Sequence, residues 1–257
     1  MAIGRLIEGG LRVNNSNFLK HKEPLISIIT VSFNADKYIE KCIKSVISQP
    51  FQNIEHIIID GNSTDNTVPI LKIYDQNIAY WRSEKDTGIY NAMNKALKFA
   101  KGKWFYFLGA DDSLLAGFSK MAERLKHENT LYYGNCIANG RILGGKISKY
   151  QVAKRNVCHQ AVFYPASVFK KYQYIEKYCI YADHALNIQC WSDTEFIKKY
   201  FKLSIADYNL NGFSSHASDD FFKADKPEFI KSNLGNIVYY RYLFKKWKEQ
   251  LKKSDFF

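Results

Sequence analysis

The 257-residue sequence lacks several features that define common protein classes. No apolar run approaches the roughly 18 residues that span a bilayer. There is no GxGxxG pattern after the first expected strand and no GxxxxGKS/T pattern anywhere, which argues against a dinucleotide-binding protein and a P-loop protein. Internal repeats and low-complexity tracts are absent as well. We therefore expect one large globular domain, or one domain with an appendage.

Cysteine is sparse, and its positions follow no recognisable metal-binding or disulfide pattern. Five cysteines lie at positions 42, 136, 158, 179 and 190, and no two of them have CxxC spacing. An odd count without such spacing argues against a disulfide framework and against a structural zinc site. No signal peptide is visible at the N-terminus. We expect the protein to work in a reducing compartment.

Acidic residues are outnumbered by basic ones, so the formal net charge is +12 with a pI near 9.3. This balance favours polyanionic partners, which include nucleic acid, an anionic membrane surface and phosphorylated ligands. No nucleic-acid-binding motif is present and the positive charge is spread rather than striped, so we expect no nucleic-acid partner. Aromatic residues make up 16% of the chain, enough for a core and for stacking on rings.

Short apolar runs alternate with helical periodicity through the first half of the chain. The expected strands cover Leu25–Val31, Ile54–Ile59, Ile78–Ser83 and Trp104–Leu108, and the expected helices cover Tyr38–Ser48, Thr67–Tyr74 and Ile89–Lys101. This βαβαβαβ order predicts a mostly parallel, doubly wound sheet with right-handed crossovers. Three strands end in the polar loops SFN, DGNSTD and GADD, at the sheet edge where such folds bind ligands.

Two adjacent carboxylates, Asp111 and Asp112, follow the apolar strand KWFYFLG. Carboxylates held this close repel each other unless a cation lies beside them. Their hard oxygen atoms suit Mg²⁺ or Mn²⁺, and these ions in turn suit a diphosphate. The alternative is a strand followed by a polar turn, in which Asp112 or Ser113 caps the next helix. The stretch alone favours the turn, whereas the rest of the chain favours the metal site.

The second half of the chain is less regular. We expect helices at Leu114–His127, Ala166–Tyr172 and Ile180–Trp191, and strands at Leu131–Asn135, Ile142–Ile147, Asn156–Tyr164 and within Ser204–Phe213. From Pro227 onward the pattern is helical, and residues 241–253 carry six basic residues against one acidic residue, with aromatic residues between them. Such a helix lies on an anionic bilayer surface or packs on its own domain with a solvated basic face, and the sequence leaves both open.

Four loops agree in order and spacing with those of a known family. The stretches ISIITVSFNADKYIEKCIKSVISQ, IEHIIIDGNSTDNT and SEKDTGIYNAMNKALKFAKGKWFYFLGADD resemble the N-terminal half of family 2 glycosyltransferases. The similarity covers residues 24–115 and continues more thinly, through HQ at 159–160 and YADH at 181–184, to about residue 190. The resemblance implies the GT-A fold: an αβα sandwich with a mostly parallel central sheet, followed by a less regular acceptor-binding half.

The resemblance also divides the chain by role. It implies a nucleotide-sugar-binding half at 24–115 and an acceptor-binding half of the same domain at 116–225, while the residues themselves indicate a leader at 1–23 and a basic aromatic helical tail at 226–257. The leader is polar, and we expect it to be poorly ordered or to form a short pre-helix.

Site residues carry over position by position. The residues implied to contact the nucleotide are Thr30, Ser32, Asp60, Asp86 and Asp111. Asp111 and Asp112 are the implied metal carboxylates, with His216 as a further metal or diphosphate ligand. Asp183 matches the catalytic base, and His159 matches a residue on the acceptor side.

Two positions depart from the commoner family pattern, which has acids where this chain has Gly61 and Gly109. Simpler interpretations also stand beside the functional ones. Asp60 and Asp183 can serve as helix-capping partners, and His159 can be a hydrogen-bonded core histidine. His216 can be merely exposed, and Trp81 and Trp191 are expected in the core.

These features together predict an inverting, metal-dependent glycosyltransferase with a UDP-sugar as donor and Mn²⁺ or Mg²⁺ as cofactor. The expected acceptor is a lipid-linked saccharide in bacterial polysaccharide (O-antigen or capsule) assembly. The expected location is the cytoplasmic face of the membrane, contacted peripherally through the C-terminal tail. The alternative is a non-catalytic sugar-nucleotide-binding subunit of a larger synthase. The acceptor is expected by analogy with the family alone.

Overall fold

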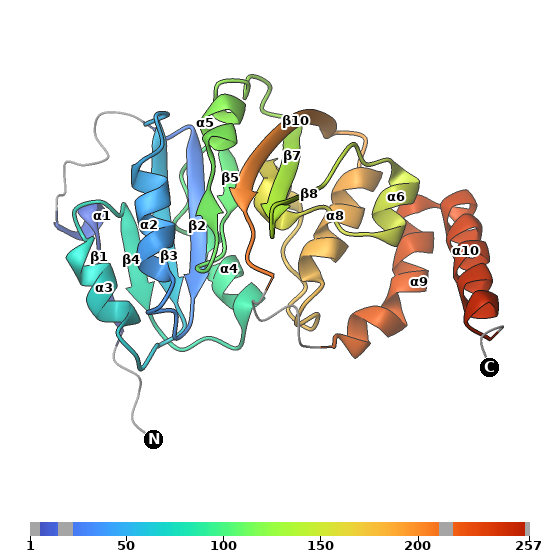
Figure 1. Cartoon of the computed structure of the whole chain (residues 1–257), viewed down its shortest axis with the longest axis horizontal. Helices are drawn as coiled ribbons and strands as arrows, with labels where there is room; N and C mark the ends of the chain where they lie inside the picture. Colours follow the sequence, from blue (N-terminus) through green and yellow to red (C-terminus); the bar gives the residue numbers. More distant parts are fainter. Residues whose placement is uncertain (1–5, 15–22, 211–217, 255–257) are drawn as a thin grey trace.

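The structure, a computed structural model, describes residues 6–14, 23–210 and 218–254. Within these residues one sheet runs in the order β1-β4-β3-β2-β5-β9-β7-β10-β6, and β8 pairs with β7 (Figure 1). The strands are β1 Ile7–Gly9, β2 Ile26–Ser32, β3 Ile54–Asp60, β4 Tyr80–Ser83, β5 Trp104–Phe107, β6 Ser113–Leu114, β7 Thr130–Ala138, β8 Arg141–Leu143, β9 Val162–Pro165 and β10 Ile197–Asp207.

The parallel core expected from the first half of the sequence is confirmed. Strand β2 pairs in parallel with β3 and β5, and β3 pairs in parallel with β4. The helices are α1 Leu11–Asn14, α2 Ile39–Ile47, α3 Thr67–Ile73, α4 Ile89–Leu97, α5 Ala116–Ala122, α6 Lys149–Lys154, α7 Val168–Lys171, α8 Ala182–Ser192, α9 Asp220–Leu234 and α10 Asn236–Ser254. Because these strands are parallel, each crossover helix carries the chain back to the edge where the strands begin, and the loops after β2, β3 and β5 lie together at the opposite edge.

Helices cover both faces of the sheet, because neighbouring strand residues point to opposite sides. Ile28 and Ile58 face the side covered by α2, α3 and α5, whereas Ile29 and Ile57 face the side of α4 and α8. The fold is therefore an αβα sandwich. None of the helices in the described residues combines the length and hydrophobicity that crossing a bilayer requires.

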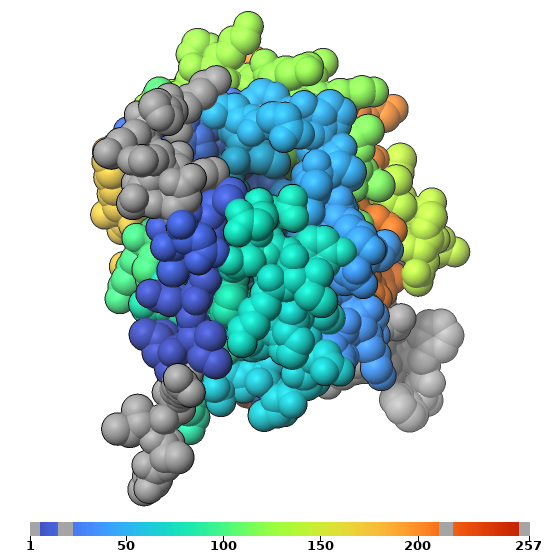
Figure 2. All heavy atoms as spheres, turned by 90° about the vertical axis from the view of Figure 1, so that its left-hand side faces the viewer, coloured from blue at the N-terminus to red at the C-terminus, as the bar shows by residue number. Residues whose placement is uncertain are grey.

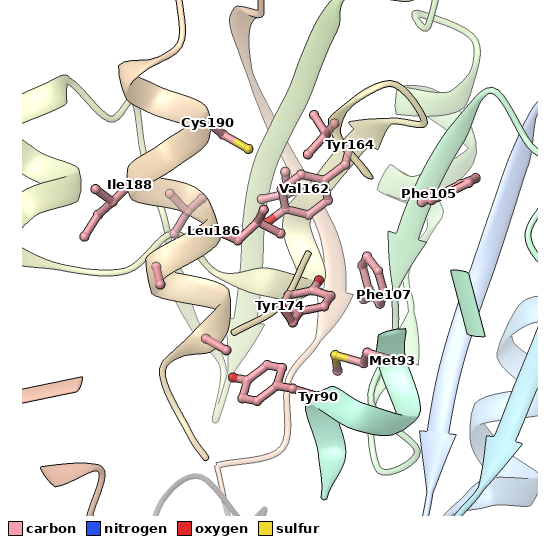
Figure 3. Close-up of a cluster of buried hydrophobic side chains, with 14 of the residues drawn as sticks. Tyr90, Met93, Phe105, Phe107, Val162, Tyr164, Tyr174, Leu186, Ile188 and Cys190 are labelled. Atoms are coloured by element: carbon pink, nitrogen blue, oxygen red, sulfur yellow. The ribbon is translucent and has the colours of Figure 1, made fainter. Parts of the chain in front are cut away.

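An aromatic cluster joins the two halves of the chain on the α4 and α8 side. Figure 3 shows Tyr90 and Met93 of α4 beside Phe107 of β5, with Leu186 of α8 across the cluster. Tyr174 lies between them, with its ring centroid 5.3 Å from those of Tyr90 and Phe107. Trp81 and Trp191 are also buried, as expected. This packing fixes the start of α8 relative to the first half of the chain.

The second half departs from the expected elements where pairing is non-local. Strand β10 begins seven residues before the expected Ser204, because its N-terminal part pairs in parallel with β7. The strand expected at Ile142–Ile147 ends at Leu143, where Gly144 and Gly145 adopt positive φ. The strand expected at Asn156–Tyr164 is replaced by an irregular segment, the short 3₁₀ helix η1 (His159–Ala161) and β9.

The N-terminal residues contain the short helix α1, in line with the expected pre-helix, and also a strand that the sequence did not predict. Ile7–Gly9 forms edge strand β1, antiparallel to β4, and the backbone N–H of Gly10 donates to Asp75 Oδ1 at 2.6 Å. Figure 2 shows these N-terminal residues lying directly against the region of α3 and β4. A Cβ at position 9 would lie 2.6 Å from the Trp81 ring, so only glycine fits this approach. The sequence pattern failed here because the strand is short and contains glycine.

Candidate active site

A cavity of about 1030 Å³ opens at the edge where the parallel strands end. Its lining comes from the loops after β2 and β5, from the start of α4, from β8, from residues 155–160 and from the start of α8. A smaller hollow of about 320 Å³ shares Asp111 with the large cavity. Both halves of the chain therefore contribute to one site.

Three of the residues implied to contact the nucleotide lie at the ends of β2 and β3. Ser32 lines the cavity, whereas Thr30 and Asp60 are fully buried and lie outside its lining. The Thr30 hydroxyl is 3.0 Å from His56 Nε2, inside the sheet. Asp60 accepts hydrogen bonds from the hydroxyls of Ser32, Ser63 and Ser83. Asp60 thus fixes the loops beneath the cavity floor rather than capping a helix.

Asp86 lines the cavity beside Gly61. A Cβ at position 61 would lie 2.7 Å from Asp86 Oδ2, so the glycine makes room for this carboxylate. Burial raises the pKa of Asp86, while the N–H of Gly88, which donates to Oδ1 at 2.9 Å, works against that shift. An acid at position 61 would add a second negative charge against Asp86.

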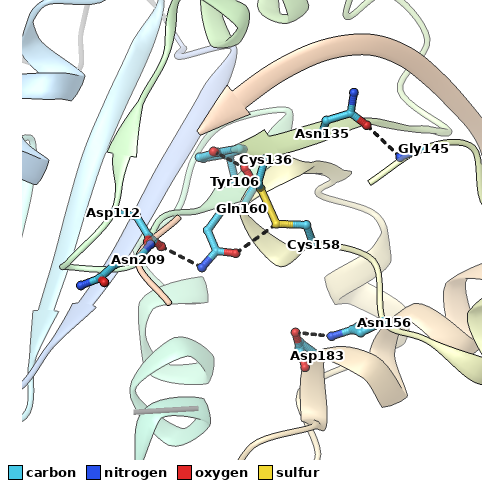
Figure 4. Close-up of a disulfide and its surroundings, with 10 residues drawn as sticks. All are labelled: Tyr106, Asp112, Asn135, Cys136, Gly145, Asn156, Cys158, Gln160, Asp183 and Asn209. Carbon is cyan, nitrogen blue, oxygen red and sulfur yellow. Dashed lines mark hydrogen bonds between the residues drawn. A yellow bond between two sulfur atoms is a disulfide. The ribbon is translucent and has the colours of Figure 1, made fainter. Parts of the chain in front are cut away.

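The adjacent acids Asp111 and Asp112 take different positions. Asp111 lines both hollows, whereas Asp112 is 1% exposed. Asp112 accepts hydrogen bonds from Gln160 Nε2 at 2.7 Å and from the Asn209 N–H at 2.9 Å (Figure 4). The helix-capping alternative is not observed, because the N-cap of α5 is Leu115 and makes no side-chain cap. Asp111 is therefore the acid of this pair that faces the cavity.

The electrostatics of this acid pair suit a cation. Burial raises the pKa of Asp112 to about 7, and the charge of Asp111 adds to that shift. Burial also raises the pKa of Asp111. Two carboxylates that are costly to ionise together become stable as anions when a divalent cation binds.

Gly109 completes the arrangement of this acid pair. A Cβ at position 109 would lie 2.4 Å from Asp112 Oδ2 and 3.0 Å from Asp111 Oδ1. The acid that the commoner family pattern has here would collide with both carboxylates in this conformation.

The donor set fits Mn²⁺ or Mg²⁺, since Mg²⁺ usually takes one or two carboxylates together with substrate phosphates and water. Across residues 6–14, 23–210 and 218–254, no three His, Cys, Asp or Glu side chains gather closely enough to hold a metal ion by themselves. His216, the additional ligand expected from the sequence, lies outside the described residues.

Asp183 lies in the first turn of α8 and lines the cavity. Its carboxylate accepts hydrogen bonds from Asn156 Nδ2 at 2.6 Å, from Tyr90 Oη at 3.2 Å and from the His184 N–H at 2.7 Å. Burial raises the pKa of Asp183 to about 6, against the effect of these bonds. A carboxylate with this pKa is well matched to accepting a proton near neutral pH.

His159 also lines the cavity, but its ring is held in the core. It stacks on Phe107 with centroids 5.1 Å apart, and Nε2 is 2.9 Å from Tyr174 Oη. Burial lowers the pKa of His159 to about 4, so the ring is neutral. These contacts match the core-histidine alternative, with one edge available to the cavity.

One expectation about cysteine was wrong. Cys136 of β7 and Cys158, just before η1, are joined in a disulfide bond (Figure 4). The two residues meet because β9, which follows η1, pairs with β7. An odd cysteine count excludes complete pairing but not a single bond, and the separation of 22 residues carries no signal. Within the described residues, Cys42, Cys179 and Cys190 are free.

The sequence reasoning also missed several cavity residues. Asn156 and Asn209, which contact the predicted acids, stand in no recognisable motif. Gln160 was visible only as the neighbour of His159. Tyr181, Ile142 and Leu143 form an exposed apolar part of the rim.

Comparison with solved structures places the fold. The chain aligns with a crystal structure of residues 1–349 of S. aureus TarS in complex with UDP, with a TM-score of 0.61 and 18% identity, over 81% of this chain and 70% of that one. It also aligns with the mannosyltransferase PcManGT from Pyrobaculum calidifontis in complex with GDP-Man and Mn²⁺, with a TM-score of 0.59 and 11% identity, over 90% and 81% of the two chains.

Sequence comparison places the family. A "PGL/p-HBAD biosynthesis glycosyltransferase" of Mycobacterium bovis is 30% identical over 243 residues, which cover 90% of this chain and 94% of that protein. The Escherichia coli protein WfgD, a "UDP-Glc:alpha-D-GlcNAc-diphosphoundecaprenol beta-1,3-glucosyltransferase", is 35% identical over 133 residues, about half of each chain. The sequence profile of Glycosyl transferase family 2 matches residues 27–185.

The structure is thus a GT-A-like αβα sandwich with a carboxylate-lined cavity at the edge where its parallel strands end. This chain belongs to glycosyltransferase family 2, since the family profile covers more than half of it and a family relative aligns along nearly its whole length.

Proposed function

We propose that this chain is an inverting glycosyltransferase that moves a sugar from a UDP-sugar to a sugar hydroxyl of a lipid-linked acceptor in bacterial polysaccharide assembly. The observation that carries the proposal is that Asp111 and Asp183, one from each half of the chain, line the same cavity. The UDP complex of TarS and the UDP-Glc and diphosphoundecaprenol in the name of WfgD support the choice of donor and acceptor.

The proposed reaction uses the two ends of the cavity differently. Asp183 takes the proton of the acceptor hydroxyl as that oxygen attacks the anomeric carbon from the face opposite the leaving group. The bond between the anomeric carbon and the diphosphate oxygen breaks, and its electron pair leaves with the diphosphate. Asn156 and Tyr90 hold the Asp183 carboxylate in place through their hydrogen bonds.

The leaving diphosphate needs compensation for its growing negative charge. Asp111 and Asp112 would hold Mn²⁺ or Mg²⁺, which supplies this electrostatic stabilisation when bound. Ser32 and Asp86 line the donor side and are the proposed nucleotide contacts, with Thr30 and Asp60 supporting them from below.

The direct test is transfer from UDP-sugars to a lipid-linked saccharide, with the anomeric configuration of the product read by NMR. An inverted linkage formed in the presence of Mn²⁺ or Mg²⁺ is expected. Retention of configuration, or turnover unaffected by EDTA, would contradict the mechanism. Donor binding without transfer to any acceptor would instead favour a non-catalytic subunit of a larger synthase.

The rate should depend on pH through Asp183. Because burial raises the pKa of this carboxyl from 3.8 to about 6, it is protonated and inactive as a base below that pH. We expect kcat to rise with pH through about 6 and to level off above it. The measurement is kcat between about pH 4 and pH 8 with both substrates saturating. A rate that stays constant down to about pH 4 would rule out this base.

The C-terminal helix offers the proposed membrane contact. Its exposed apolar residues Ile237, Tyr240, Phe244, Trp247 and Leu251 recur at spacings of three and four, which places them on one face. The exposed fraction is 78% for Ile237 and 53% for Trp247. Val238, Tyr239 and Tyr242 pack against the core instead. The helix therefore packs on its own domain through one face and leaves a second, apolar face exposed for the proposed membrane contact.

The charges beside this apolar face favour an anionic bilayer over a second copy of the chain. Arg241 and Lys248 flank it on one side and Leu243 and Gln250 on the other, so no acid stands opposite these cations in a paired helix. Cations beside exposed aromatic residues suit anionic headgroups.

We expect Phe244→Ser/Trp247→Ser to weaken binding to vesicles that contain phosphatidylglycerol by about tenfold or more, through lost apolar burial. Co-sedimentation with anionic and neutral vesicles measures this effect. The matched control is Ile197→Ser, since Ile197 of β10 is 54% exposed and lies outside the helix. Equal binding of the variant and the wild type would remove the helix from the proposal. A change from dimer to monomer without lipid would assign the face to a second copy.

A further inference from the structure

A short segment, residues 156–160, runs from the end of α6 into η1 and touches both ends of the proposed active site. Asn156 Nδ2 donates to Asp183 Oδ2 at 2.6 Å, and Gln160 Nε2 donates to Asp112 Oδ2 at 2.7 Å. Cys158 lies midway between them and is bonded to Cys136 of β7. Figure 4 shows the two amides pointing in different directions from this segment, each toward its own carboxylate.

Further contacts of this segment restrict the orientation of the Asn156 and Gln160 side-chain amides. Asn187 Nδ2 donates to Asn156 Oδ1 at 3.0 Å, so the Asn156 amide must present its NH₂ group to Asp183. At the other end, Tyr106 Oη donates to the backbone carbonyl of Gln160 at 2.6 Å. Gln160 Oε1 lies 3.6 Å from Cys158 Sγ, which as a disulfide sulfur has no proton to donate.

The disulfide connects this irregular segment to the rigid part of the fold. Cys136 is fully buried in β7, which pairs with β8, β9 and β10. Residues 156–158 form no strand or helix, and the bond adds a cross-link to β7 beside the continuation of the chain through η1 into β9. Without this cross-link the segment keeps its hydrogen bonds but has more freedom to shift relative to β7.

We propose that residues 156–160, fixed by the Cys136–Cys158 disulfide, form one positioning element that sets the distance between Asp183 and Asp112, and that reduction of the bond lowers transfer. Asn156 and Gln160 are its positioning residues. The proposal rests on the proposed function for the roles of the two acids. A dithiol would reverse the link by thiol–disulfide exchange: the protein disulfide gains two electrons and two protons to give two thiols, and the dithiol becomes a disulfide.

The first measurement is the state of the bond. Thiol titration of the denatured, unreduced protein should find three reactive thiols of the five cysteines, and five after treatment with a dithiol. Five thiols in fully active protein before reduction would overturn the proposal.

The second measurement is transfer before and after reduction. We expect reduction to lower kcat about tenfold, the size of effect that a small displacement of a catalytic group produces, and reoxidation to restore it. Cys136→Ala should start at the lowered rate and ignore the dithiol. Cys190→Ala, which removes a buried free cysteine, should respond as the wild type does. An unchanged kcat after complete reduction would refute the role of the bond.

Variants of Asn156 and Gln160 distinguish a positioning role in the active site from an effect on protein stability. Asn156→Ala should lower kcat about tenfold with the Kd for UDP unchanged, whereas Gln160→Ala should raise that Kd in the presence of Mn²⁺. Reduction should lower kcat less in Asn156→Ala than in the wild type, because one link has already been lost. Equal losses of kcat and UDP affinity in both variants, in proportion to thermal stability, would mean a structural role only.

Hydrogen exchange tests whether the disulfide holds this segment, independently of the proposed function. If the wild type transfers no sugar in either redox state, the proposed function fails. Exchange of the backbone amides of residues 156–160 should still rise on reduction. Unchanged exchange would show that the disulfide does not hold the segment, whatever the reaction is.

Discussion

Asp183→Asn is expected to lower kcat about 1,000-fold, within the range for loss of a general base, and to leave the Kd for UDP within about twofold. The amide has the shape of the carboxylate but cannot accept the acceptor's proton. Donor binding should persist because the proposed donor contacts, Asp86 and Asp111, lie on other elements.

The measurement is transfer under saturating donor and acceptor, together with calorimetry of UDP binding. The control is Asp220→Asn, which neutralises an acid whose side chain is 87% exposed at the start of α9. If Asp183→Asn retained more than about a tenth of the wild-type rate, this residue would not be the base.

Asp111→Ala/Asp112→Ala is expected to abolish metal-dependent binding of UDP. The double variant removes the carboxylate pair proposed to hold the cation, which in turn holds the diphosphate. Calorimetry with UDP and Mn²⁺, Mg²⁺ or EDTA measures this loss.

The two single variants of this acid pair should weaken metal binding to different extents. Asp111→Asn should weaken Mn²⁺ binding more than Asp112→Asn does, because Asp111 faces the cavity while Asp112 is buried and bonded to Gln160 and Asn209. If EDTA left UDP binding by the wild type unchanged, the donor site would work without a metal. The reverse order of the single variants would make Asp112 the main ligand.

The first half of the fold was predictable because its signals are local. Each strand from β2 to β5 is a short apolar run, and a helix of clear periodicity follows β2, β3 and β4, so the bounds of these strands were predicted to within about two residues. The positions of Ser32 and Asp111 followed from the rule that parallel strands end at one edge, whereas Asp86 was recognised by the family resemblance. The same rule did not predict how deeply each side chain is buried, because Thr30 and Asp60 face inward from the same strand ends.

The rest depended on contacts between distant residues. Asp183 was recognisable by resemblance, but nothing in its surroundings in the sequence pointed to Asn156 or Tyr90 as partners. The disulfide likewise required β7 and β9 to be paired first. Strand β1 escaped notice because it gains its place from Trp81 and Asp75 rather than from its own composition.

The anchoring of Asp112 has a consequence for the order of events during synthesis. Its carboxylate is held by the backbone of Asn209, 97 residues later, and β6 directly after it pairs with the end of β10. A nascent chain that has exposed the whole nucleotide-side half still lacks these contacts. We expect donor competence to appear only after about residue 209 has left the ribosome, so that unfinished chains do not sequester nucleotide sugars.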